Sequence, residues 1–151
     1  MVEQNPELAA ALEQLEQRLE TPIVPGELAS WIEEVAPAWR RAESLLRLQV
    51  TTTHPKLLNE IMRQDQGLAT RVAQLQQADA GLIRQMDDVR QIVDELRTTV
   101  DHLEPDEKLA EDATVNLVEK GLQVVIAARK QEAAMSTWYV EAFERDRGVV
   151  D

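Results

Sequence analysis

Cysteine is absent from this chain of 151 residues, and glycine, proline and aromatic residues are scarce. The lack of cysteine excludes disulfides and thiolate metal sites. Because aromatics make up only 3% of the residues, the chain has few of the side chains that favour strands. The abundant residues are instead Ala, Leu, Glu, Gln and Arg, which are strong helix formers. The composition therefore predicts an all-α protein.

Long apolar runs and positive charge are also lacking. No stretch reaches the roughly 20 apolar residues that a transmembrane helix needs, and the N-terminus is polar and acidic, unlike a secretory signal. We therefore expect no transmembrane segment and a cytoplasmic location. The 28 acidic residues outnumber the 16 basic ones, which gives a formal net charge of -12. This balance opposes nucleic-acid binding and favours a protein partner, which includes a basic client protein.

Motifs that carry chemistry are missing as well. The sequence has no Gly-rich phosphate loop, no nucleophile elbow and no Ser-His-Asp grouping. Its two histidines, His54 and His102, lack the glutamate three residues earlier that ferritin-like metal sites use, and we expect both in turns at opposite ends of one helix. We predict no catalytic residue, no metal site and no cofactor. A helical-bundle enzyme or small-ligand carrier built from scattered residues is the least favoured alternative.

A heptad pattern runs through the middle third of the chain. Twelve of the fourteen positions that follow alternating steps of three and four residues are large and apolar. These positions are Leu58, Ile61, Asp65, Leu68, Val72, Leu75, Asp79, Leu82, Met86, Val89, Val93, Leu96, Val100 and Leu103. A spacing that averages 3.5 residues is typical of a long helix that packs against other helices as in a coiled coil. It predicts a rod rather than a reaction.

Prolines divide a single domain of residues 1–151 into four predicted helices. Asn5-Pro6-Glu7 reads as an N-cap followed by the start of a helix that ends at residue 20. The other predicted helices cover residues 27–53, 56–103 and 105–147, and Pro37 should kink the second of them. We expect tight turns at His54-Pro55 and at Glu104-Pro105.

Matching the helix lengths suggests an elongated antiparallel helical bundle with coiled-coil-like packing. In this interpretation three long rods lie side by side, and the first rod is broken into two helices laid end to end. The alternative is a break near Asp79 to Gly81, which would give a shorter bundle of four or five helices. We favour an unbroken rod because the heptad phase passes through Gly81 without a slip.

The register of this bundle identifies four candidate polar core residues. Folding the last two helices together about Glu104-Pro105 brings Asp65 level with Glu144 and Arg145, and Asp79 level with Lys130 and Gln131. Polar residues within an apolar seam usually specify register and oligomeric state, and this is the role we predict for all four. Folding the chain about His54-Pro55 brings Trp39 level with Trp138.

The C-terminal segment holds three of the five aromatic residues. Trp138, Tyr139 and Phe143, together with Arg145, are the candidate partner-binding residues, because aromatics and arginine are enriched where interfaces are strongest. The other interpretation is a local aromatic core that includes Trp31 and Trp39.

These observations favour a non-enzymatic helical scaffold or protein-interaction protein, and self-association is one form of that interaction. The second hypothesis is an acidic binding protein for a basic client, such as an immunity protein, a chaperone or a nucleic-acid mimic.

Overall fold

The computed structural model describes residues 5–102 and 107–148, with side chains as far as residue 144. It confirms the all-α helical bundle, and no strand occurs among the described residues. The elements are α1 (Pro6–Glu20), α2 (Leu28–Leu48), the π-helical turn η1 (Gln49–Thr53), α3 (His54–Gln64), the 3-10 turn η2 (Gln66–Leu68), α4 (Ala69–Val100) and α5 (Glu107–Gly148).

Helix α1 begins where the sequence predicts it. The Asn5 side chain accepts hydrogen bonds from the amides of Glu7 and Leu8, which satisfies donors that have no partner inside the helix. After Thr21 the chain turns back through Gly26, whose φ of 85° suits a residue without a Cβ. Helices α1 and α2 therefore pack against each other, and the prediction that they lie end to end is wrong.

The turn predicted at His54-Pro55 is also wrong, because the chain continues there as a helix. Pro55 has no amide hydrogen, and in a regular α-helix its ring would clash with the carbonyl four residues earlier. The structure accommodates the proline by widening the preceding turn, in which the His54 amide donates to the Gln49 carbonyl five residues back. As a result α2, η1 and α3 form one long rod. Pro37 lies within α2 and does not end it.

The chain reverses instead at Asp65. Asp65 ends α3 with extended backbone angles, and its side chain accepts a hydrogen bond from the Gly67 amide at the start of η2. The predicted helix 56–103 is therefore wrong at its N-terminal end. The prediction that the helix passes unbroken through Gly81 is confirmed, because α4 is continuous from Ala69 to Val100. The turn predicted at Glu104-Pro105 lies outside the described residues.

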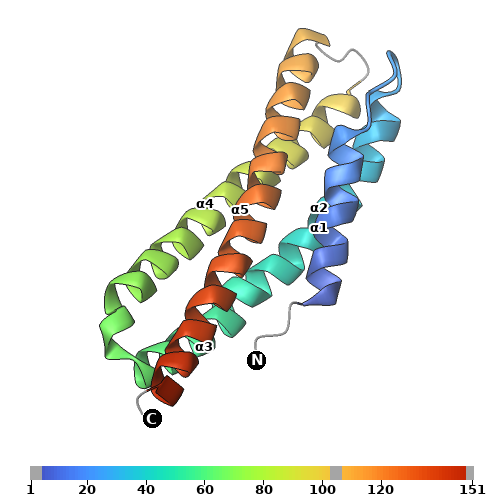
Figure 1. Ribbon diagram of the computed structural model, residues 1–151. Helices are drawn as coiled ribbons and strands as arrows, with labels where there is room; N and C mark the ends of the chain where they lie inside the picture. Colours follow the sequence, from blue (N-terminus) through green and yellow to red (C-terminus); the bar gives the residue numbers. More distant parts are fainter. Residues whose placement is uncertain (1–4, 103–106, 149–151) are drawn as a thin grey trace.

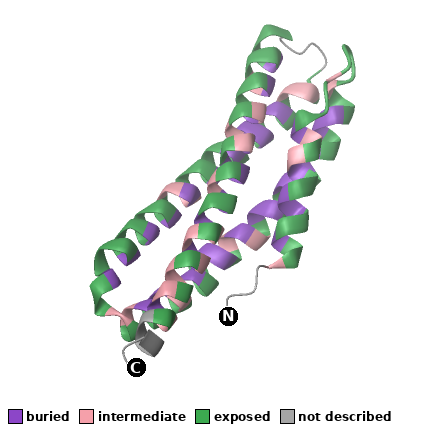
Figure 2. Ribbon diagram, in the orientation of Figure 1, coloured by how far each residue is buried: buried purple, intermediate pink, exposed green. Residues whose placement is uncertain are grey.

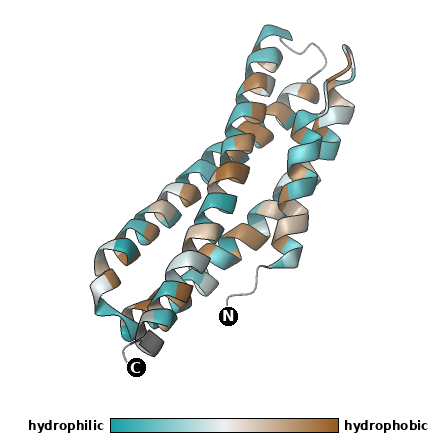
Figure 3. Ribbon diagram, viewed as in Figure 1, coloured by the Kyte–Doolittle hydropathy of each residue, from teal (hydrophilic) through white to brown (hydrophobic). Residues whose placement is uncertain are grey.

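The number of helices differs between the two halves of the bundle (Figure 1). In the four-helix half, α1, α2, α4 from Leu82 onward and α5 as far as Ala128 surround one core. Helix α1 reaches only to the end of α2, because the two are antiparallel and joined by a short loop. In the three-helix half, α3, the start of α4 and the end of α5 enclose a smaller core. Buried and hydrophobic positions follow the inner sides of these helices (Figures 2 and 3).

Helices α4 and α5 contact each other along much of their length. The Gln131 amide donates to the carbonyl of Leu75, and the Arg71 guanidinium lies 4.9 Å from the centre of the Trp138 ring. The prediction that Trp39 and Trp138 lie at the same height along the bundle is wrong, because it depended on a turn at His54-Pro55. Trp39 belongs to the core of the four-helix half, whereas Trp138 packs on the core of the three-helix half.

Candidate functional sites

A buried polar network lies where the two halves meet. Nδ1 of His54 lies 2.9 Å from a carboxylate oxygen of Asp79, and Nε2 of the same ring lies 3.1 Å from the side-chain amide of Gln49. His54 and Asp79 are only 2% and 6% exposed. The π-helical turn positions two of these residues, because Gln49 opens it and His54 comes directly after it. Burial of polar groups at this depth requires that they satisfy one another.

The network connects the long α2–α3 rod to α4. A histidine paired with an aspartate is also part of catalytic triads, but there a nucleophile occupies the second ring nitrogen. Here that nitrogen contacts Gln49, an amide that cannot act as a nucleophile, and all three side chains are buried. This arrangement can fix how the rods align along their length. A buried polar residue needs its hydrogen-bond partner. If the α2–α3 rod slid by one helical turn along α4, His54 and Asp79 would separate.

Gln131 contributes a second buried polar contact close to this network. Its side chain is buried in α5 and donates a 2.8 Å hydrogen bond to the Leu75 carbonyl, one helical turn before Asp79. The sequence identified both Asp79 and Gln131 as polar core candidates, and both are buried. Their effect on oligomeric state stays a prediction. The expectation that His54 is a turn residue is wrong, and the sequence missed its pairing with Asp79.

The other two polar core candidates lie elsewhere. Asp65 is half-buried and caps the turn between α3 and α4, so it does not lie within a continuous seam. Arg145 lies in α5, but its side chain is outside the described residues. The prediction that Asp65 and Arg145 lie at the same height along the bundle is therefore not tested.

A second charged cluster bridges α2 and α4 in the four-helix half. Glu43 is buried and bonds Arg90 at 2.7 Å and Arg47 at 3.0 Å, and Arg47 also contacts Asp87. Burial alone would lower the pKa of Arg47, but the hydrogen bonds and charges of Asp87 and Glu43 raise it overall. The buried carboxylate is therefore paired on both sides, which suits a structural contact between helices.

The C-terminal aromatics pack within the chain. Trp138, Tyr139 and Phe143 are all half-buried, and the rings of Tyr139 and Phe143 lie 4.5 Å apart. Glu60 of α3 interacts with Tyr139 and contributes to its raised pKa, while Trp138 stacks with Arg71 of α4. These contacts show that the three rings take part in packing within the chain, and whether they also bind a partner stays a prediction.

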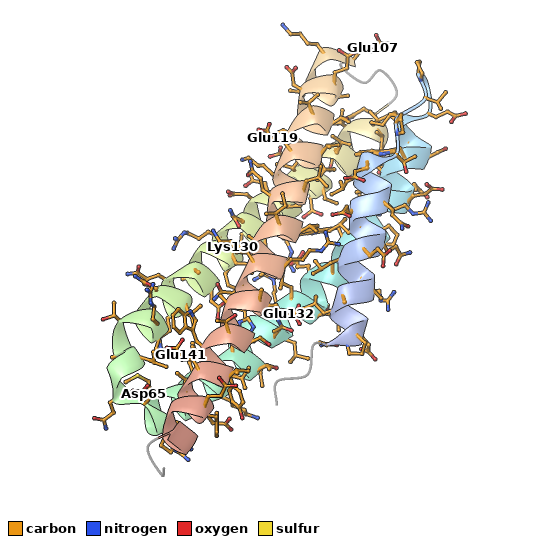
Figure 4. The ribbon with its side chains drawn as sticks, in the orientation of Figure 1. Asp65, Glu107, Glu119, Lys130, Glu132 and Glu141 are labelled. Carbon is orange, nitrogen blue, oxygen red and sulfur yellow. The ribbon has the colours of Figure 1, made fainter. Side chains whose placement is uncertain are left out.

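The outward face of α5 differs from the outer faces of its neighbours. Val115, Ile126 and Val140 are 66%, 63% and 43% exposed, and their spacing of 11 and 14 residues places them on one side of an α-helix. Glu119 and Lys130 are exposed on the same side (Figure 4). This side is opposite the residues that contact α1 and α4, such as Gly121 and Gln131.

A groove lies between α4 and α5, lined by residues of both helices. It has a volume of about 610 Å³ and opens widely to solvent. Asp87, Asp94 and Glu95 line one wall together with Arg90, and the exposed Leu109 lies at its edge.

Comparison of the chain with protein-family models, curated proteins and solved structures finds no match. Over the described residues, no helix combines the length and apolar character needed to cross a bilayer. The same residues contain no cluster of three or more side chains that could ligate a metal ion.

Proposed function

We propose that this protein is a non-enzymatic helical scaffold or interaction protein that binds a protein chain through the outward face of α5. The observation that carries the proposal is the row of exposed Val115, Ile126 and Val140 on that face. Single exposed apolar residues are common in soluble proteins, but these three stand out because all of them lie on one side of the same helix.

A comparison between helices supports this proposal. Among the described residues, α1, α3 and α4 expose no large hydrophobic side chain, although each has an outer face of its own. Leu122 is half-buried at the edge of the α5 row, and Ala133 is exposed within it. A helix whose only task is to close the bundle needs apolar residues on its inner side alone. The second apolar stripe of α5 is therefore in excess of what folding requires.

The polar network favours a structural role over catalysis. His54, Asp79 and Gln49 bond one another and are closed to solvent, so a substrate could reach them only if the rods separated. A scaffold benefits from such a network because it fixes one alignment of the α2–α3 rod against α4.

A photo-crosslinking amino acid at position 126 tests the proposal in cells that express the full chain. We expect adducts with a protein from position 126 and none from Gln77, an exposed position on α4 that serves as the matched control. Equal labelling at both positions, or no adduct at position 126, would contradict the proposal.

The acidic groove favours a second candidate function, in which the protein binds a basic client. Its walls carry more acidic than basic side chains, and Leu109 adds an apolar edge, so a basic amphipathic helix would match it. Binding of such a helix should weaken strongly as salt rises. Replacing Asp94 by Asn should then reduce the affinity, while Glu33→Gln on α2 should leave it unchanged.

A further inference from the structure

We infer that the partner of the outward face of α5 is a second copy of this chain, packed antiparallel about a two-fold axis. The inference rests on the proposed function, since it names the occupant of the same face. The order of charged and apolar residues along that face supports it. Glu119 precedes Ile126 by seven residues, and Lys130 lies four residues after it.

Among the described residues, Glu119 and Lys130 have no ion-pair partner, although Arg129 beside them pairs with Glu16 of α1. In an antiparallel pairing centred between residues 124 and 125, Glu119 of each copy lies level with Lys130 of the other. The two-fold axis therefore creates two opposite-charge pairs from one sequence. A parallel pairing in register would instead place Glu119 against Glu119.

The same register also matches the apolar residues. Leu122 of one copy then lies level with residue 127 of the other, beside Ile126, and Val115 lies level with residue 134, beside Ala133. These contacts are isologous, so each occurs twice. No additional shift is needed to align them once the charges are paired. One arrangement thus pairs the charged residues and brings Val115, Leu122 and Ile126 of each copy into the interface.

The size of this interface sets the expected affinity. Residues 112–137 span about 39 Å at about 1.5 Å per residue. One helix from each copy gives an interface near or below the low end of the standard range of about 1,200 Å². We therefore expect a reversible dimer with a dissociation constant on the order of micromolar.

Charge reversal tests the register on the purified full chain. Sedimentation equilibrium over about 5 to 500 µM should show a monomer–dimer equilibrium. Glu119→Lys alone, or Lys130→Glu alone, places like charges together twice and should weaken the dimer about tenfold. An equimolar mixture of the two variants should restore dimerisation, because both cross-pairs then carry opposite charges. The double variant Glu119→Lys/Lys130→Glu should dimerise for the same reason.

Controls separate this inference from the proposed function. Glu33→Lys on α2 should leave the dimer unchanged, and far-UV circular dichroism should show that each surface variant keeps its helix content. A dimer that the mixed variants fail to restore would overturn the two-fold register. A chain that stays monomeric while position 126 crosslinks a different protein would overturn self-association and support the proposed function. A monomer that also gives no adduct at position 126 would overturn both.

Discussion

In the part of the chain that the structure describes, four helices enclose the core at the end of the bundle that contains Leu19, whereas three enclose it at the end that contains Ile61. The difference arises because α1 reaches only to the end of α2. Beyond that point α3 packs chiefly against α5, while α2 packs against α1 and α4. The long rod therefore changes neighbours along its length. The change occurs at η1, directly before Pro55.

The comparison shows how a bundle can lose a helix without leaving a gap. A regular helix through this region would keep the same face toward the core, and the place of α1 would be empty. The π-helical turn inserts one residue into the helical repeat, which rotates and tilts α3 relative to α2. The buried His54, Gln49 and Asp79 lie at this point, where the regular α-helical repeat is interrupted. Polar groups there specify an alignment that apolar packing alone leaves loose.

The largest difference between the halves should appear in matched core truncations. Leu15→Ala in the four-helix half and Leu58→Ala in the three-helix half delete the same atoms from residues that are both nearly fully buried. Leu-to-Ala changes in cores cost about 2 to 5 kcal/mol, and the cost is larger where neighbours cannot move into the cavity. We expect Leu15→Ala near the upper value and Leu58→Ala near the lower one. Urea unfolding measures both, and a larger cost for Leu58 would contradict the comparison.

The boundary between the halves should respond strongly to loss of one polar partner. Asp79→Leu leaves the buried His54 ring nitrogen without its acceptor, so we expect a loss of about 1 to 3 kcal/mol in the free energy of unfolding. The double variant His54→Leu/Asp79→Leu removes both groups and should recover most of that loss. A double-mutant cycle measures the coupling. A coupling near zero would show that the contact does not stabilise the fold.

The sequence predicted much of this fold because local chemistry sets it. Periodicity predicted the helical bundle, Asn5 and Pro6 the start of α1, and Gly81 was correctly placed inside a helix. The location of the reversal between rods was wrong for a definite reason. His54-Pro55 has the local form of a turn, but tertiary packing and a π-helical turn carry the helix through it. Asp65-Gln66-Gly67 has an equally good turn sequence. It was not predicted as a turn because Asp65 and Leu68 continue the heptad spacing across it.

The candidate sites were less predictable because they depend on contacts between distant residues. The burial of Asp79 could be predicted from its heptad position, but its pairing with His54 requires the correct path of the rod. The exposed row on α5 could not be predicted, because the inner face of this helix includes small residues such as Gly121 and Ala128. The hydrophobic pattern therefore did not show which side of α5 faces the core. Apolar residues on the outer side of a helix can be identified as exposed only when the side that faces the core is known.

Two glycines provide a smaller test of how tightly each region is packed. A Cβ at Gly121 would lie 2.7 Å from a terminal carbon of Leu19 in the four-helix half, whereas a Cβ at Gly81 would meet only the end of Arg84 at 3.8 Å. Gly81→Ala should therefore stabilise the protein by about 0.5 to 1 kcal/mol through its helix propensity. Gly121→Ala should gain less or destabilise, because Leu19 must move. Thermal unfolding of both variants measures the difference, and equal gains would contradict tight packing at Gly121.

The smallest expected effect is a titration in the three-helix half. Burial raises the pKa of Tyr139 above its usual value of about 10, and the charge and hydrogen bond of Glu60 raise it further. The fold therefore favours the neutral phenol. Its contribution to the free energy of unfolding is complete below about pH 10 and is lost as pH rises through the pKa of the folded state. Glu60→Gln should lower this pKa without abolishing the shift, since burial is the larger cause. Absorbance near 295 nm reports phenolate formation, with Tyr139 the sole tyrosine of the chain. An unchanged titration in Glu60→Gln would show that α3 and α5 do not meet at this contact in solution, and the three-helix packing would then need a different alignment.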